Sequence, residues 1–285
     1  LVVQDRTPED AAHIVQRICG VCPVSHAHAS SIAAEKAYGI TIPNNARIIR
    51  NLIEGGQFLH SHILWFYTLA ALDYVNPLNA LNANIADAYD LVEAAGTSCQ
   101  SDLKALAQRL TKFAENGQLS IFSGNWFKNG QADTEYKLPP ELDLICTAHY
   151  IEALTMQSKA SEICGLLGGK MPHVMTLVPG GTSFVPTEEK LDDLWSLVHE
   201  VRDWIAATMI PDTKAIVPYY LDALNFGKGC GRYVAWGVFE RESFQMADRY
   251  LPSGVINEQL QLSEVNEDLI KEYVGHSWYE GDSDL

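Results

Sequence analysis

Hydrophobic positions recur along most of the chain at steps of three, four and seven residues, the pattern of amphipathic helices. The longest such run follows Pro43-Asn44 and predicts a long helix. Its hydrophobic stripe consists of Ile48, Leu52, Leu59, Ile63, Phe66 and Ala70. Gly55-Gly56 lies in the middle of this run, where the missing side chains permit another backbone to approach closely.

Further helices are expected on both sides of this run. They extend from Pro23 toward Gly39, from Thr97 to Gly117, from about Glu141 to Leu167, and from Thr187 to about Met209. Pro23 suits the first turn of a helix, and Thr187 suits an N-cap. The helix that begins at Thr97 is expected to bury Leu103, Leu106, Leu110 and Phe113.

The remaining segments predict turns and short strands. Residues 119–140 are expected to be irregular, and the pairs Gly168-Gly169 and Gly180-Gly181 mark tight turns. After Pro211 the pattern becomes a β-like alternation from Tyr233 to Phe239. No internal repeat or low-complexity linker divides the chain, so we expect one domain over 1–285. The predicted fold class is mainly α, a long-helix bundle with small β-containing peripheral loops.

Composition narrows the function classes. Of 285 residues, 47% are hydrophobic, as in globular proteins, and the longest apolar stretch, Ile63 to Leu72, is too short to span a bilayer. The formal charge of −16 argues against a nucleic-acid partner, because phosphate binding needs a basic surface. Leu1 opens the chain without the pattern of a secretory signal peptide, and the expectation is that this sequence is a piece of a longer protein.

Among the six cysteines, Cys19 and Cys22 are the only pair whose spacing suggests a function. Two thiols separated by two residues can reach one metal ion, and the start of the predicted helix would lower a thiol pKa there. The pair is half of a metal site, a redox dithiol or incidental packing. Covalent haem attachment is excluded because Pro23 follows Cys22. The other cysteines are expected to be small buried hydrophobes: Cys99, Cys146, Cys164 and Cys230.

His26 follows Cys22 by about one helical turn. Its imidazole could therefore donate a hydrogen bond to the Cys22 sulfur. The alternative is a capping or surface histidine.

The segment Arg17-Ile18-Cys19-Gly20-Val21-Cys22, followed by His26, resembles the N-terminal metal-binding motif of the large subunit of nickel–iron hydrogenases. Further blocks resemble that family in the same order, and the likeness is greatest to its uptake or membrane-associated branch. These blocks are Arg50–Leu52, His60–Val75, Thr147–Leu154, Gly168–His173 with Gly180-Gly181, and His276–Gly281.

The resemblance implies a catalytic subunit that cleaves or forms H2 at a nickel–iron centre whose iron carries diatomic ligands. It implies that Cys19 binds nickel and that Cys22 bridges nickel and iron, with His26 tuning the bridging sulfur. Arg17, Ser61 and His173 are implied neighbours of the centre or of the electron exit. Ser61 stands where many members of the family have Asp.

The resemblance also implies an iron–sulfur small subunit, which holds the clusters and receives the electrons in a heterodimer. A membrane cytochrome is a further implied partner. The implied location is periplasmic or membrane-associated through the partner subunit, with the cytoplasm as the alternative. A second CxxC and the glutamate expected to accept the proton would lie in segments of the large subunit outside these residues.

Two other functions remain open at this stage. One is a non-catalytic helical scaffold from the respiratory-complex and hydrogenase superfamily that has lost the metal thiolates. Retention of both Cys19 and Cys22 argues against that scaffold. The other is a zinc- or dithiol-bearing interaction protein.

Overall fold

The computed structural model describes residues 2–122 and 136–271. Contacts between backbone positions group the chain into two compact units. The first comprises Leu1–Gly55, Leu167–Val185 and Gly227–Leu285, and the second comprises Gly56–Leu166 and Pro186–Phe226. Helices dominate and the strands are short, which confirms the predicted mainly α fold class. A single domain over 1–285 remains a prediction.

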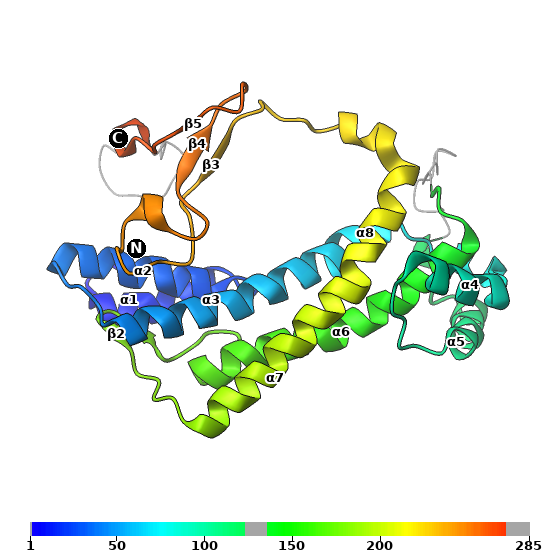
Figure 1. The fold of residues 1–285 in the computed structure, drawn as a ribbon, viewed down its shortest axis with the longest axis horizontal. Coiled ribbons are helices and arrows are strands. Elements are labelled where there is room, and N and C mark those ends of the chain that lie inside the picture. Colours follow the sequence, from blue (N-terminus) through cyan, green and yellow to red (C-terminus); the bar gives the residue numbers. More distant parts are fainter. Residues whose placement is uncertain (1, 123–135, 272–285) are drawn as a thin grey trace. The chain divides into compact units, whose positions relative to one another are not determined.

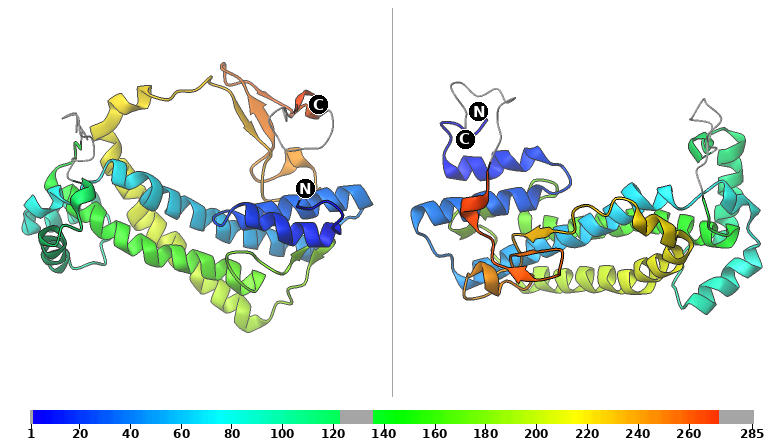
Figure 2. Two further views of the ribbon diagram at one scale, coloured as in Figure 1. Left: turned by 180° about the vertical axis from the view of Figure 1, so that it is seen from behind. Right: turned by 90° about the horizontal axis from the view of Figure 1, so that it is seen from above.

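The first unit contains α1 (Pro8–Val15), α2 (Pro23–Tyr38) and the first part of α3 (Asn44–Ile63). Helices α1 and α2 run side by side (Figures 1 and 2). The prediction for α2 is confirmed, because Pro23 occupies its first turn and Gly39 ends it with a left-handed φ of 68°.

Two small antiparallel sheets complete the first unit. Strand β1 (Leu177–Val178) pairs with β2 (Gly181–Thr182), so the turn predicted at Gly180-Gly181 is the hairpin turn. The second sheet consists of β3 (Tyr233–Ala235), β4 (Gly254–Ile256) and β5 (Leu262–Ser263), in that order. The alternation predicted to reach Phe239 was too long. Strand β3 ends at Ala235, and Gly237 and Phe239 have positive φ angles of 81° and 64°.

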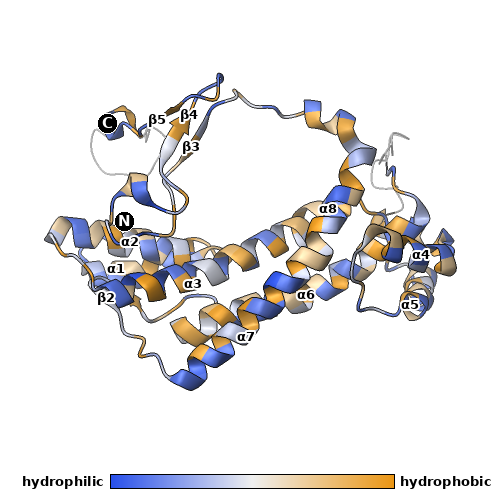
Figure 3. Cartoon of the chain, viewed as in Figure 1, coloured by the Kyte–Doolittle hydropathy of each residue, from blue (hydrophilic) through white to orange (hydrophobic). Residues whose placement is uncertain are grey.

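The second unit consists of α4 (Ile85–Ala95), α5 (Leu103–Glu115), most of α6 (Pro140–Gly168), α7 (Glu188–Trp204) and α8 (Ile210–Ile216). Helix α7 begins at the predicted cap, since Thr187 accepts a hydrogen bond from the Lys190 backbone. Hydrophilic and hydrophobic residues alternate along α7 in Figure 3. The sequence patterns had not predicted α4.

Two helix limits were predicted wrongly. Helix α5 begins at Leu103 rather than Thr97, because the Asp102 side chain caps it by accepting from Ala105 N. The chain also stays helical beyond Pro211, because the helical turn of Ile205–Met209 continues directly into α8. The Ala207 carbonyl, four residues before Pro211, accepts from Ser98 N and Thr97 Oγ1 in place of the N–H that proline lacks.

Two long helices, α3 and α7, are each followed by a π-helical segment in the second unit. Residues Leu64–Ala70 after α3 and Ile205–Met209 after α7 form π-helical turns. Such turns insert one extra residue per turn and are frequent at functional sites. The shorter 3₁₀ turns span Gln16–Ile18, Ala71–Asp73, Asn79–Asn82, Ser120–Phe122, Val217–Asn225, Met246–Asp248 and Glu267–Leu269.

The stripe predicted along α3 is correct only in part. Ile48 is 41% exposed, whereas the neighbouring Ile49 is buried. The close approach predicted at Gly55-Gly56 occurs at Gly56, where an added Cβ would lie 2.8 Å from Ile163 Cγ2 in α6. At Gly55 the same atom would lie 3.8 Å from Phe239, an ordinary contact.

Parts of two sequence predictions lie outside the described residues. These are the block His276–Gly281 and residues 123–135 of the excursion expected over 119–140. Among the described helices, none is long and apolar enough to cross a membrane.

Candidate metal centre

Cys19 and Cys22 occupy the turn between α1 and α2. Cys19 is extended, with φ −142° and ψ 127°, and Cys22 is the N-cap residue of α2. The Cys22 N–H donates to Cys19 Sγ over 3.2 Å. The predicted placement of the pair at a helix N-terminus is therefore confirmed, and the two sulfurs lie within 4.8 Å of each other.

The two thiols have opposite pKa shifts. The pKa of Cys19 is lowered by a hydrogen bond from the Cys22 thiol and by the backbone N–H groups of Cys22 and Val21. Burial, the hydrogen bond with Cys19 and the Cys19 charge raise the pKa of Cys22 to about 11. Cys19 is therefore the first of the pair to become a thiolate, and it shares the proton that Cys22 keeps.

His26 lies beside this pair on the first turns of α2. Its ring nitrogen and the two sulfurs are all within 4.8 Å of one another, and all three residues are half-buried. The start of α2 and the extended residues just before it thus bring together two sulfur donors and one nitrogen. The role of His26 as a donor to the Cys22 sulfur stays a prediction.

A buried ion pair fixes α2 against α3 in the first unit. Arg50 is fully buried and donates to both carboxylate oxygens of Glu35 over 2.5 and 3.0 Å. The same guanidinium donates to the carbonyls of Val178 and Gly181, and Glu35 accepts from Gly180 N. One charged pair therefore holds the β1–β2 hairpin and the helix that carries the cysteines.

A second polar group links α2 to α3 near Cys22. The Glu54 carboxylate accepts from Ser25 Oγ over 2.7 Å and lies 3.6 Å from His28 Nδ1. Its charge contributes to the raised pKa of Cys22. A pocket opens beside these side chains, and Trp236 and Arg249 also line it.

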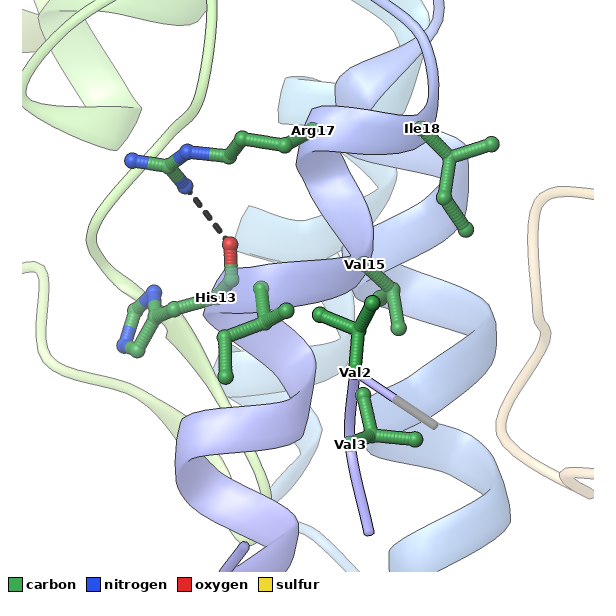
Figure 4. Close-up of a pocket in the computed structure, with 7 residues that line it drawn as sticks. Val2, Val3, His13, Val15, Arg17 and Ile18 are labelled. Carbon is green, nitrogen blue, oxygen red and sulfur yellow. Dashed lines mark hydrogen bonds between the residues drawn. The ribbon is translucent and has the colours of Figure 1, made fainter.

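An apolar pocket is lined by residues that directly precede Cys19. Figure 4 shows Val2, Val3, Val15 and Ile18 around it, with His13 and Arg17 at its edge. Arg17 Nη1 donates to the His13 carbonyl over 2.6 Å, and its side chain is exposed. The guanidinium is therefore free at its outer edge to face solvent or a bound group, while its place near the metal remains a prediction.

His173 lies beside the segment that precedes the cysteines. Burial lowers its pKa, as do the charges of Arg17 and Lys170, and its ring makes a hydrogen bond with the Gln16 backbone. Gln16 is itself buried and donates to the Val174 carbonyl over 2.9 Å. The structure thus joins His173 to the cysteine turn through Gln16. Ser61 is half-buried in the second unit, and its part in the site remains a prediction.

The remaining cysteines fall into three environments. Cys146 and Cys164 are buried, as expected for small hydrophobes. Cys230 is exposed, so the expectation was wrong there, whereas Cys99 is half-buried and packs against the core of the second unit. Cys230 follows the turn glycine Gly229, and Cys99 lies in the loop before α5.

The second unit holds a cluster of possible metal ligands that the sequence patterns did not predict. Cys99, His149 and Glu152 present a sulfur, a nitrogen and a carboxylate oxygen within 4.8 Å of one another. The spacing His149-x-x-Glu152 places both side chains on one face of α6, and this was the available signal. Cys99 is far from them in sequence, and only the fold brings it near.

The donor set at the α2 turn fits a soft transition metal. Thiolates suit nickel and iron, and sulfur can bridge two metal ions. The Cys22 N–H already donates to Cys19 Sγ, so negative charge on that sulfur is stabilised before any metal binds. Two thiolates alone make half of a four-sulfur set, so the present residues fit part of a nickel–iron site.

The chain is similar to known proteins over nearly its whole length. The sequence profile of the nickel-dependent hydrogenase family matches residues 1–285. The chain is 35% identical to the uptake hydrogenase large subunit of Rhodobacter capsulatus, over 98% of this chain and 50% of that protein. It is 34% identical to the Hydrogenase-2 large chain of Escherichia coli K12, over 99% of this chain and 52% of that one.

Solved structures give the same result. The Ni-Fe-Se hydrogenase of Desulfovibrio vulgaris Hildenborough, in its as-isolated oxidized state, superposes with a TM-score of 0.75 and 31% identity. The match covers 98% of this chain and 48% of that chain. The resemblance is confirmed, and the chain belongs to the nickel-dependent hydrogenase family. It spans about half the length of the curated relatives that it matches.

Proposed function

We propose that this chain is part of the catalytic subunit of a nickel–iron hydrogenase, which cleaves H2 reversibly into protons and electrons. The observation that carries this proposal is the pair of sulfurs on one turn, at the start of α2, in a chain of this family. In this proposal Cys19 binds nickel, and Cys22 bridges nickel and iron. When bound, the metal pair supplies a Lewis acid that polarises H2 for heterolytic cleavage.

The residues of this chain have separate tasks in the proposal. Cys19 and Cys22 hold the metal pair, and His26 orients the Cys22 sulfur. Arg50 and Glu35 keep α2 in place, so the sulfurs are presented in a fixed geometry. Two thiolates are too few for a nickel–iron pair, so the remaining ligands would come from segments of the large subunit other than these residues.

Partners and location follow from the same assignment. A buried metal pair needs an electron exit, and we propose an iron–sulfur small subunit that docks near the cysteine turn and His173. The apolar pocket between Val2, Val15 and Ile18 would give such a partner a hydrophobic contact. The proposed location is periplasmic or membrane-associated through this partner, and a membrane cytochrome would accept the electrons. The non-catalytic scaffold is disfavoured because both thiolates are retained.

The test is Cys22→Ser in the full-length large subunit, produced together with its small subunit. We expect nickel content and H2 uptake with an artificial electron acceptor each to fall by at least 100-fold (about 2.7 kcal/mol or more), because a hydroxyl cannot replace a bridging thiolate.

Cys230→Ser is the matched control, since Cys230 is exposed and lies outside the cysteine turn. It should keep full nickel content and activity. An assembled Cys22→Ser enzyme with undiminished H2 uptake would refute the proposed function.

A further inference from the structure

The cluster of Cys99, His149 and Glu152 in the second unit takes no part in the function proposed above. Its donors come from two segments: the loop before α5 carries Cys99, and α6 carries His149 and Glu152. Cys99 Sγ lies 3.8 Å from Glu152 Oε1. A tetrahedral ion with a metal–sulfur bond of about 2.3 Å and a metal–oxygen bond of about 2.1 Å would hold these two atoms at nearly this separation.

The His149 imidazole is buried, and one of its nitrogens is without a hydrogen bond of ordinary geometry. His149 is 0% exposed, and its Nδ1 lies 2.8 Å from Asp212 Oδ1. Its Nε2 is buried and makes no hydrogen bond of ordinary geometry. Although burial lowers the pKa of His149, hydrogen bonds with Asp212 and Cys99 and the charges of both groups raise it to about 10. A buried imidazole nitrogen with no partner is costly unless something binds it.

Asp212 holds this ring in the orientation that a metal ligand requires. It is 2% exposed, and its second oxygen, Oδ2, accepts from Tyr67 Oη over 2.7 Å. Metal-binding histidines usually donate their other ring N–H to a carboxylate, which fixes the tautomer and the ring plane. With Nδ1 donating to Asp212, Nε2 is the ring nitrogen left for a cation, which would take the place of its proton.

Several hydrogen-bond donors hold the Glu152 carboxylate. Its Oε1 accepts from Gln100 N, Ser101 N and Ser101 Oγ over 2.8 to 2.9 Å. Its Oε2 accepts only from Trp204 Nε1, over 3.2 Å. These bonds fix the carboxylate in place, with Oε1 the oxygen that lies beside Cys99 Sγ.

The loop that carries Cys99 is fastened to the π-helical turn after α7. Ser98 N and Thr97 Oγ1 both donate to the Ala207 carbonyl, and Thr208 Oγ1 donates back to the Ser98 carbonyl. The sulfur is thus held over α6 by three hydrogen bonds that do not involve it. Cys99 remains half-buried, which leaves an entry path from solvent.

We propose that Cys99, His149 and Glu152 bind one zinc ion, with Asp212 positioning the imidazole and water as the fourth ligand. Sulfur, nitrogen and carboxylate oxygen together suit zinc better than magnesium or calcium, which prefer oxygen alone. The ion would tie the loop before α5 to α6. This inference does not depend on the proposed hydrogenase activity.

The test uses the full-length large subunit assembled with its small subunit, after incubation with zinc sulfate and removal of free zinc. Elemental analysis should find one zinc per complex, and X-ray absorption at the zinc edge should show one sulfur neighbour at about 2.3 Å. The zinc edge reports zinc alone, so nickel and iron elsewhere do not interfere.

Cys99→Ser should remove the sulfur neighbour and weaken zinc binding by at least tenfold against a chelator. Cys230→Ser should change neither, because Cys230 is exposed and lies in the first unit. Wild-type complex that holds no stoichiometric zinc after this treatment would overturn the proposal, and so would a zinc–sulfur signal that persists in Cys99→Ser. If Cys99→Ser does not assemble, the wild-type spectrum alone tests the proposal. A sulfur neighbour of zinc supports it, and the absence of one overturns it.

Discussion

The environments of the candidate metal ligands differ between the cysteine turn (Cys19–Cys22) of the first unit and the cluster of Cys99, His149 and Glu152 in the second. At the turn, both sulfurs are half-buried on four consecutive residues, and backbone N–H groups favour the thiolate of Cys19. In the cluster, the nitrogen and carboxylate donors are buried and braced by Asp212 and Trp204. A site whose residues are close together in the sequence can be predicted from a motif. A site whose residues are brought together only by tertiary packing cannot.

In both units, the residues that stabilise the fold are different from the candidate metal ligands. In the first unit the buried pair of Arg50 and Glu35 supports the turn, while the cysteines contribute little packing of their own. In the second unit the supporting helices pack closely at Gly56 and bury Asp143. Substitutions of supporting residues should therefore cost folding free energy, and substitutions of donors should cost metal or turnover.

The largest expected loss of stability follows Arg50→Met. This change leaves the Glu35 carboxylate buried without its cation, and breaking such a pair costs about 3–5 kcal/mol. Arg202→Met is the control, because Arg202 pairs with Asp203 with both side chains at least 60% exposed, and it should cost under about 1 kcal/mol. Thermal unfolding of the assembled complex measures both, and equal shifts for the two variants would contradict the supporting role of Arg50.

A pH effect is expected at Asp143 in the first turn of α6. Burial raises its pKa from 3.8 to about 6, although Asn76 N and Asn79 Nδ2 donate to it. The folded protein therefore retains this proton at a pH where the unfolded chain has lost it. The stability that this contributes is present below pH 4 and is lost as the pH rises through 6, by about 3 kcal/mol at most.

Asp143→Asn removes this titration. The difference in unfolding temperature between wild type and the variant should change between pH 4 and pH 6, in the direction that weakens the wild type at the higher pH. A difference that stays constant over this range would show that Asp143 is ionised in the folded protein throughout.

Gly56→Ala should cost about 1–3 kcal/mol, because the new methyl group would lie 2.8 Å from Ile163 and 2.9 Å from Cys164. Gly55→Ala is a matched control one residue away, where the methyl group meets only Phe239 at 3.8 Å. The control should stabilise the helix by about 0.5–1 kcal/mol. Unfolding temperatures that move in the same direction for both variants would refute the close packing of α3 on α6.

The smallest effect on stability is expected for His26→Ala. His26 is half-buried, so unfolding should change by less than about 0.5 kcal/mol. H2 turnover should fall by about 10–100-fold with the metal retained, because the lost group orients a ligand rather than serving as one. Redox titration and steady-state kinetics of the full-length complex measure this, and unchanged values would make His26 a surface residue of α2.

The sequence predicted elements whose signals are local. Pro23, Gly39 and Thr187 mark helix ends through their own backbone chemistry, and each marks the expected end. Helix α4 was missed although Asn84 caps it, because its short run of Ile85–Ala95 carries no long stripe. The helical stretch after Pro211 was missed because a proline that suits a first turn was taken as the end of a helix.

The two sites show the same limit. Cys19, Cys22 and His26 lie within eight residues, so spacing alone brings them together. The nearness of Cys99 to His149 depends on hydrogen bonds to Ala207 and Thr208. No periodicity in the sequence encodes such long-range contacts.

The most direct test of the central assignment is X-ray absorption at the nickel edge of the full-length complex, with and without Cys19→Ser. The assignment predicts that wild type holds stoichiometric nickel with sulfur neighbours, and that the variant either loses its nickel or loses one sulfur neighbour. Stoichiometric nickel with an unchanged sulfur shell in Cys19→Ser would contradict the claim that the cysteine turn at the start of α2 binds the metal.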